Sequence, residues 1–340
     1  MSSGAHDPEA GVGRRLGPFV LLRRLALTGS AEVFEARCEE STRLPGCAPG
    51  RIVVIKRLLP HALEDAARVE RLCAEARLGL SLDHPHVVRT HGLLWLADGE
   101  TDAWDPATGS SARGEPLLVT GLVEGGPLYH ADARDLEPTE PAVVAALGQR
   151  LCEALAEVHA RGVVHGDVCP RNLLLTTDGT LVLIDLGSAC PIDAHPPGGA
   201  LAEGRGGYAS PEQLAGEPLG TSSDLFSAAV ILWELAEGRR LFPANRRGPQ
   251  EPGPREPSPP ASLADDRNAA PWGHLHAALS PRPEDRPASA AALAADLEAW
   301  LAADSHPSPE HILAAWRRGA AQASFSGAAS AVARRPTDAD

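Results

Sequence analysis

Lysine is the scarcest informative residue in this 340-residue sequence, because Lys56 is the single copy among 31 basic residues. The chain uses arginine at every other basic position, yet keeps a lysine at the end of the apolar run Ile52–Lys56. This choice predicts a chemical need for that amine. Asparagine is also scarce, and one copy, Asn172, lies between apolar runs. Because asparagine also suits turns, Asn172 is the weaker of the two candidates.

The sequence lacks the features of several protein classes. No apolar run reaches the roughly 20 residues of a membrane-spanning helix, and the longest is Leu225–Leu235, so we expect no membrane span. The first residues show no basic-then-apolar leader pattern. A net charge of −14 argues against nucleic acid as a partner. The six cysteines show no CxxC or histidine pairing, which favours reduced thiols and a cytoplasmic location over disulfides or zinc.

Length and composition predict a core of substantial size, because 43% of the residues are hydrophobic. We expect a disordered tail over residues 1–15, one folded region over 16–302 and a partly disordered extension over 303–340. Inside the folded region, a Pro-rich stretch at 243–271 reads as an insert, since it lacks apolar periodicity.

Apolar spacing predicts most of the elements. A strand is expected at Ile52–Lys56, one helix over His61–Leu80 and another over Pro141–Arg161. Further on, Leu173–Thr176 and Leu181–Ile184 flank a glycine-containing turn and predict a β-hairpin.

Polar residues gather around this hairpin. His165 and Asp167 precede it, Asn172 begins it, and Asp185 follows it in the triplet Asp-Leu-Gly. This order resembles the catalytic loop HRDxxxxN and the metal-binding loop DFG of the protein kinases.

Other stretches resemble the same family. Lys56 ends a run that is similar to the family's VAIK, and Glu75 falls where the family's helix presents the glutamate that pairs with that lysine. Glu212 ends a Ser-Pro-Glu that resembles APE, while Asp224 begins a run that is similar to DxxSxGV. Arg286 resembles the late arginine that pairs with the APE glutamate. Together these stretches resemble the bacterial eukaryotic-type Ser/Thr protein kinases. The bias toward Arg, Ala, Gly and Pro is typical of a GC-rich bacterial genome and agrees with a bacterial source.

The resemblance implies an α+β fold with two lobes. The small lobe, 16–123, would be an antiparallel sheet with one main helix, and the large lobe, 124–302, would be mainly helical. The implied cofactors are ATP and Mg²⁺, and the implied partners are protein substrates.

The resemblance also implies roles for five residues. Lys56, held by Glu75, would position the α- and β-phosphates of ATP, and Asp167 would accept the proton of the substrate hydroxyl. Asn172 and Asp185 would be the metal ligands, since Mg²⁺ prefers hard oxygen donors.

The remaining residues implied by the resemblance either line the ATP site or support the catalytic loop. Thr120 would be the gatekeeper, and main-chain groups at Gly121–Val123 would bond the adenine edge. The implied ATP-binding set is Ala26, Gly29, Val33, Val54, Lys56, Thr120, Leu122, Val123 and Leu174. The implied structural set is His165, Glu212, Asp224 and Arg286.

Several positions depart from the family pattern. The glycine slots of the phosphate-covering loop hold Ala26, Thr28 and Ala31, which weakens the expected clamping of phosphates because side chains keep the backbone away. Val54 replaces the usual alanine and narrows the adenine pocket.

Further departures lie in the catalytic loop, where two positive charges are lost, and in the segment after it. Gly166 replaces the arginine of HRD, so the usual pocket for an activation-loop phosphate is missing, and we predict that any activity is independent of phosphorylation there. Cys169 replaces a lysine and Arg205 a threonine. Arg171 or Arg205 is our candidate to restore the lost charge, whereas Leu186 for Phe in DFG is tolerated by volume.

Three functions compete at this point. The first is an active Ser/Thr protein kinase, because the loop keeps a proline before Arg171 that is typical of that class. The second is a pseudokinase that binds nucleotide or acts as a scaffold, for which the glycine-poor loop, Val54 and Cys169 argue. The third is a small-molecule kinase of the aminoglycoside or choline type, which His165-Gly-Asp167 also resembles.

Overall fold

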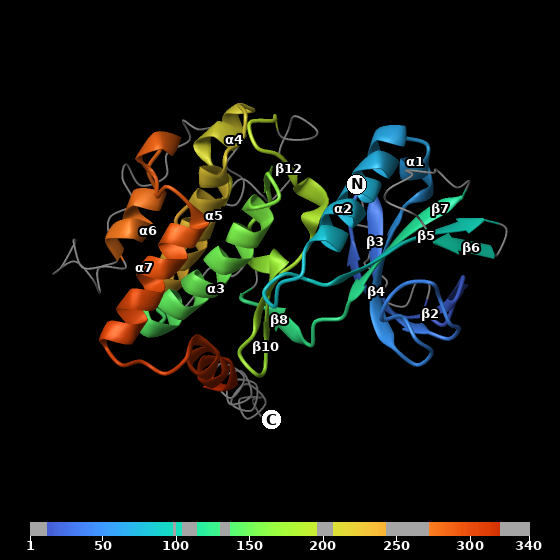
Figure 1. Cartoon of the computed structure of the whole chain (residues 1–340), viewed down its shortest axis with the longest axis horizontal. Coiled ribbons are helices and arrows are strands. Elements are labelled where there is room, and N and C mark those ends of the chain that lie inside the picture. Colours follow the sequence, from blue (N-terminus) through green and yellow to red (C-terminus); the bar gives the residue numbers. More distant parts are fainter. Residues whose placement is uncertain are drawn as a thin grey trace, which may run out of the picture. The chain divides into compact units, whose positions relative to one another are not determined.

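The computed structural model describes residues 12–97, 100–103, 114–129, 137–195, 207–242 and 272–319 (Figure 1). They form two compact units, which we treat separately. The first unit holds the residues up to Val123 together with Asp185–Gly187, and the second holds the others. Arg205, the stretch 243–271 and most of the tail expected at 1–15 lie outside the described residues.

The first unit is built on a seven-stranded antiparallel sheet in the order β1-β2-β3-β4-β7-β5-β6. Side chains alternate between its two faces, so on β7 Leu117 and Val119 pack with Phe34 while Leu118 packs with Leu72 of α2. The strands are β1 (Arg15–Leu16), β2 (Phe19–Leu27), β3 (Ala31–Cys38), β4 (Ile52–Leu58), β5 (Thr90–Ala97), β6 (Glu100–Ala103) and β7 (Glu115–Gly121).

Two predictions for this unit need correction. The helix expected over His61–Leu80 is two helices, α1 (Pro60–Leu63) and α2 (Ala66–Ser81). The break occurs because Asp65 caps α2, its side chain accepting a hydrogen bond from Ala67 N. In addition, Arg15 is already paired with Val20 in the sheet, so the folded region starts before residue 16.

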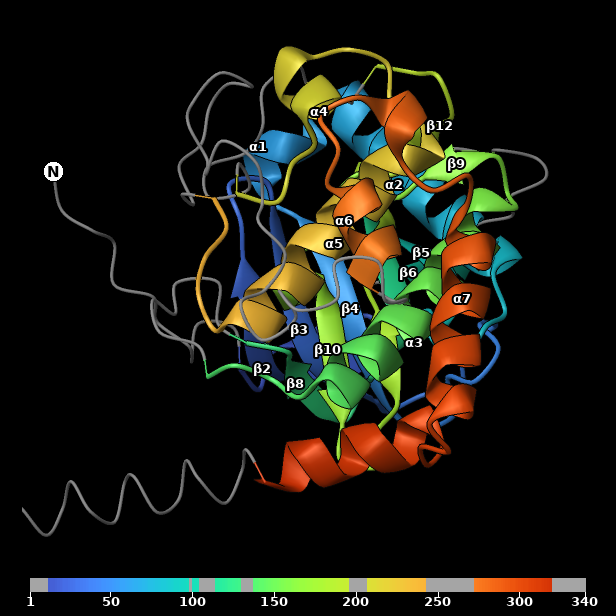
Figure 2. The same ribbon diagram turned by 90° about the vertical axis from the view of Figure 1, so that its left-hand side faces the viewer.

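The second unit is mainly helical. Its centre is α5, which is buried along almost its whole length, and α3 packs against both α5 and α7. Figure 2 shows α7 beside α3. The helices are α3 (Pro141–His159), α4 (Pro211–Ala215), α5 (Thr221–Glu237), α6 (Trp272–Ala278) and α7 (Ala290–Ala303), followed by a helix over residues 309–319.

Two small sheets complete this unit. The expected hairpin is present as β10 (Leu173–Thr176) and β11 (Leu181–Leu183), and β8 (Gly125–Pro127) pairs with β10 on its other side. The second sheet joins β9 (Val163–Val164) to β12 (Cys190–Pro191). Two 3₁₀ turns, η1 (Pro170–Asn172) and η2 (Leu186–Ser188), adjoin the hairpin in sequence, and a third, η4 (Pro283–Asp285), precedes α7.

All six cysteines are buried and free. Among the described residues, none of the helices is both long and apolar enough to cross a lipid bilayer.

Candidate functional site

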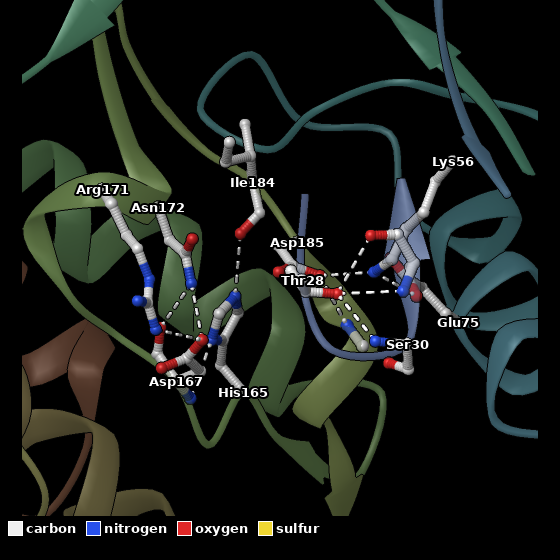
Figure 3. Close-up of polar contacts among 12 residues, drawn as sticks. Thr28, Ser30, Lys56, Glu75, His165, Asp167, Arg171, Asn172, Ile184 and Asp185 are labelled. Atoms are coloured by element: carbon white, nitrogen blue, oxygen red, sulfur yellow. Dashed lines mark hydrogen bonds and ion pairs between the residues drawn. The ribbon is translucent and has the colours of Figure 1, made fainter. Parts of the chain in front are cut away.

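The first unit gathers the single lysine and two carboxylates (Figure 3). Lys56 lies on β4 and its Nζ donates to both Glu75 carboxylate oxygens at 2.9 Å. The same Nζ donates to Asp185 Oδ1 at 2.8 Å. α2 supplies Glu75, and the Asp185–Gly187 segment supplies Asp185. The predicted pair of Lys56 and Glu75 is therefore part of a three-residue ionic cluster.

The charges in this cluster determine its protonation. Burial lowers the pKa of Lys56, but Glu75 and Asp185 outweigh burial and leave the pKa above its usual value. The amine therefore stays a cation at neutral pH. Burial raises the pKa of Glu75 to about 7, with Lys56 opposing the rise. Asp185 is the most exposed of the three side chains at 37%, against 21% for Lys56 and 8% for Glu75.

The backbone around Asp185 is specialised to hold the cluster. Asp185 adopts a left-handed conformation with φ of 64°, which is uncommon for a residue with a side chain. At Gly187, a Cβ would lie 2.9 Å from Glu75 Oε2 and 3.0 Å from Lys56 Nζ. A side chain on the glycine of the Asp-Leu-Gly triplet would thus have to displace these charged groups.

The turn between β2 and β3 binds its own amides. Thr28 Oγ1 accepts hydrogen bonds from Ala31 N at 3.0 Å and from Ser30 N at 3.4 Å. Gly29, the one glycine in this turn, has no other residue within 4 Å of a Cβ built on it. The N–H groups that a phosphate-covering loop would offer are therefore partly used by a threonine side chain. The sequence contains Thr28 at a glycine slot, but this hydrogen-bonding role was not predicted.

Several of the predicted ATP-binding residues are neighbours in the sheet. Ala26 pairs with Val33, which in turn pairs with Lys56 on the next strand. Val54 pairs with Thr120 of β7.

Other members of that predicted set lie apart from these pairs in the chain. Leu122 and Val123 follow directly after β7. Leu174 belongs to the second unit, where it pairs with Val182 and Pro127.

The second unit holds the loop that contains Asp167. Asn172 Nδ2 donates to Asp167 O and to Asp167 Oδ2, both at 2.9 Å. The Asn172 side-chain oxygen points away from Asp167 in Figure 3 and can serve a metal. His165 is fully buried, and its Nδ1 accepts from Asp167 N at 3.2 Å. Of the two predicted metal ligands, Asn172 and Asp185 each supply an oxygen, the donor type that Mg²⁺ prefers.

Asp224 of α5 holds this loop through its backbone. Its Oδ2 accepts from His165 N at 2.7 Å and its Oδ1 from Gly166 N at 2.9 Å. Oδ2 also lies 2.8 Å from His159 Nε2. Because Asp224 is only 1% exposed, these bonds satisfy a carboxylate that would otherwise be costly to bury.

Gly166 has a conformational reason to be glycine. Its φ is +73°, in the left-handed region, and a Cβ there would lie 2.9 Å from Ser188 O. The missing arginine of the HRD pattern is thus replaced by the residue best suited to this backbone.

Neighbouring side chains contact Asp167 on both carboxylate oxygens. Arg171 Nη2 lies 3.7 Å from Asp167 Oδ2, and Cys169 Sγ lies 3.7 Å from Oδ1. Of the two arginines considered as sources of charge, Arg171 approaches Asp167, whereas Arg205 lies outside the described residues.

The predicted ion pair between Glu212 and Arg286 is present and buried. Arg286 donates to the two Glu212 oxygens at 2.7 and 2.8 Å. Ser223 Oγ donates to Glu212 Oε1 at 2.7 Å. Burial raises the pKa of Glu212, but the hydrogen bonds from Arg286 and Ser223 outweigh it and leave the pKa below its usual value.

Another buried carboxylate, Glu234, was not predicted from the sequence. Glu234 of α5 accepts from Tyr129 Oη at 2.8 Å, from Tyr208 Oη at 3.0 Å and from Arg240 Nη1 at 3.0 Å. These are the only two tyrosines of the chain. Their scarcity, together with a glutamate in an apolar helix, was the signal that could have revealed the cluster.

Comparison with known proteins shows which families this chain is similar to. A family model described as "Protein kinase domain" matches residues 46–256. The chain is 35% identical over 237 residues to the probable serine/threonine-protein kinase PkwA of Thermomonospora curvata, covering 69% of this chain and 28% of PkwA. It is 32% identical over 306 residues to the serine/threonine-protein kinase Pkn1 of Myxococcus xanthus, covering 88% and 40%. It is 30% identical over 340 residues to the serine/threonine-protein kinase PknH of Mycobacterium bovis, covering 97% and 51%. The chain thus spans about half or less of the length of these relatives.

Proposed function

This chain belongs to the protein kinase family, and from that membership we propose that it transfers the γ-phosphate of ATP to Ser or Thr hydroxyls of protein substrates in signalling. The observation that carries the proposal is the cluster of Lys56, Glu75 and Asp185, in which the only lysine of the chain bonds two carboxylates. Ser/Thr specificity is supported by the names of the relatives and by the proline in the Asp167–Asn172 loop.

Lys56 and Glu75 would serve the nucleotide. The amine is held as a cation by the carboxylates, so it can bind the α- and β-phosphates without first having to gain a proton. Glu75 fixes the direction of the side chain, which reduces the entropy lost when phosphate binds.

Asp167 would act on the substrate hydroxyl. Its carboxylate accepts the hydroxyl proton as the oxygen bonds to the γ-phosphorus and the bond between that phosphorus and the bridging oxygen of ADP breaks. Asn172 and Arg171 contact Asp167 and help to hold its carboxylate in position.

Magnesium, when bound with ATP, would neutralise the phosphate charge. The Asp185 carboxylate and the Asn172 amide oxygen would hold it. The fit is chemical: Asp185 is the most exposed member of its cluster, and the Asn172 amide nitrogen is engaged by Asp167, which leaves its oxygen.

One observation favours a second function, that of a nucleotide-binding pseudokinase. In the turn after β2, Thr28 binds the amides of Ser30 and Ala31, so phosphate would have to compete with an internal acceptor. The names of the relatives favour the active kinase.

We place this part of the protein in the cytoplasm on the strength of its six free, buried thiols, which fit a reducing compartment. The net charge of −14 supports protein substrates over nucleic acid as partners.

The test incubates the purified chain with Mg-ATP and a generic basic protein, beside an Asp167→Asn control. Transfer should fall by about 10² to 10⁴-fold in the control, because the general base is lost. In parallel, an amine-reactive ATP analogue should label Lys56, and ATP should block the labelling. No transfer with Lys56 still protected would favour the pseudokinase. If the chain transfers no phosphate and ATP does not protect Lys56 from labelling, both functions are refuted.

A further inference from the structure

Gly166, the residue before Asp167, is held by hydrogen bonds at both its N–H and its C=O group. Gly166 N donates to Asp224 Oδ1 at 2.9 Å, and Gly166 O accepts from Gln213 Nε2 at 2.8 Å. A glycine with φ of +73° has more conformational freedom than any other residue, so its partners must supply the order. Asp224 binds the Gly166 N–H group, and Gln213 binds the Gly166 carbonyl oxygen.

Gln213 is itself held rigidly. It lies in α4, whose first turn is capped by Ser210, with Gln213 N donating to Ser210 Oγ at 3.3 Å. The preceding residue, Glu212, forms the buried pair with Arg286. A short helix pinned by a buried ion pair therefore presents the glutamine amide to the loop.

The segment before α4 offers no hydroxyl side chain between Ser188 and Tyr208. Tyr208 and Ser210 are only 3% and 0% exposed, and both are hydrogen-bonded, to Glu234 and to Gln213 N respectively. Phosphorylation therefore has no target between Ser188 and Tyr208, and its two targets beyond are buried. Apart from Ser188, which is half-buried at the start of the segment, this stretch leaves the ordering of the loop to contacts that carry no phosphate.

We propose that Gln213 is a positioning residue that sets the geometry of Asp167 through its hydrogen bond to Gly166 O. The bond is neutral, and it links the anchored end of the segment after Asp185 to the catalytic loop. In this chain Gly166 replaces the arginine of HRD, so no side chain at this position can bind a phosphate. The inference rests on the proposed kinase activity and names a device that makes this activity independent of phosphorylation.

The experiment compares Gln213→Leu, which keeps the size and removes the donor, with Gln213→Lys, which keeps an N–H donor. Gln149→Leu is the control, because it also removes a hydrogen bond donated by a glutamine Nε2, here to the Glu153 carboxylate Oε1 at 3.1 Å, elsewhere in the same unit. For each, kcat and the KM values for ATP and protein are measured with Mg-ATP, and hydrogen exchange is followed in the peptide that contains residues 165–172.

We expect Gln213→Leu to lower kcat about tenfold, since small misplacements of a reacting group are costly, with little change in the KM for ATP. Hydrogen exchange at residues 165–167 should accelerate in this variant alone. Gln213→Lys should recover most of kcat, and treatment of the wild type with a phosphatase should leave kcat unchanged.

The inference is overturned if exchange and kcat in Gln213→Leu equal those of the wild type, or if Gln149→Leu lowers kcat as much. If the wild type transfers no phosphate, the kinase proposal fails, while the exchange measurement still decides whether Gln213 orders the loop.

Discussion

The two polar clusters of this molecule are held by different forces. Around Lys56, the side-chain contacts of the amine join opposite charges, because the amine pairs with both Glu75 and Asp185. Around Asp167, the loop is held largely through backbone N–H and C=O groups, by Asp224 on one side and Gln213 on the other. Ionic contacts demand particular side chains, whereas backbone contacts demand a particular conformation. The first cluster should therefore break when a charge is removed, and the second when a glycine is replaced.

Among the changes that compare the two clusters, the largest effect is expected for Lys56→Met. Removing the cation takes away the donor for the phosphates and leaves two carboxylates facing each other, so transfer should fall by roughly 10² to 10³-fold. Initial rates at saturating Mg-ATP measure the loss. The control is Arg57→Met, which removes the next basic residue of β4 and its pair with Glu115 at 2.7 Å. An equal loss in both variants would mean that β4 stability, and not the amine, is responsible.

A large effect on stability is expected for Glu212→Gln. This change leaves Arg286 buried without a full charge partner and should lower the free energy of unfolding by about 3 kcal/mol at pH 7. Because the pKa of Glu212 is lower in the folded state, its contribution is present above the usual pKa of 4.5 and is lost as the pH falls through the folded value. Urea unfolding at several pH values should thus show the wild type and the variant converging in acid.

The exposed Glu217→Gln, just after the same helix, is the control and should show neither effect. A difference between Glu212→Gln and the wild type that persists undiminished in acid would contradict the assigned charge state.

A smaller effect is expected for Gly166→Ala, for which the chain offers a close match. Gly162 has φ of +75° with nothing within 4 Å of a Cβ, whereas Gly166 has φ of +73° and Ser188 O at 2.9 Å. Both alanine variants should lose about 1–2 kcal/mol of stability from left-handed strain. Gly166→Ala should lose further stability beyond this strain, because its Cβ would collide with Ser188 O, and it alone should lower kcat. Thermal unfolding and initial rates measure these effects, and identical behaviour of the two variants would show that the contact with Ser188 O has no consequence.

The charged half of the candidate site could be predicted from the sequence, and the neutral half largely could not. Lys56 stood out by its rarity, and Glu75 by the resemblance to the protein kinases, whose helix presents a glutamate at this place. Gln213 gave no such signal, because a half-buried glutamine in a short helix fits no motif and its partner is 47 positions away. Thr28 was visible only as a missing glycine. Long-range hydrogen bonds of neutral side chains leave no periodicity, so only the fold brings them together.

For the fold, periodicity predicted the hairpin of β10 and β11 and the long helices, since burial imposes regular spacing there. The interruption before α2 was missed, although Asp65 is a residue that favours helix starts. Spacing alone cannot separate one kinked helix from two capped ones.

The helix of residues 309–319 lies against the turn between β10 and β11 of the second unit. A Cβ on Gly179, in the turn between β10 and β11, would collide with Glu310 O, and Arg150 Nη2 binds Glu310 Oε1 at 2.6 Å. Figure 2 shows this helix across the end of β10. A dye, an affinity tag or a fused protein joined after residue 319 would therefore be attached close to the hairpin that connects Asn172 to Asp185. A chain cut after α7 would instead leave that turn uncovered.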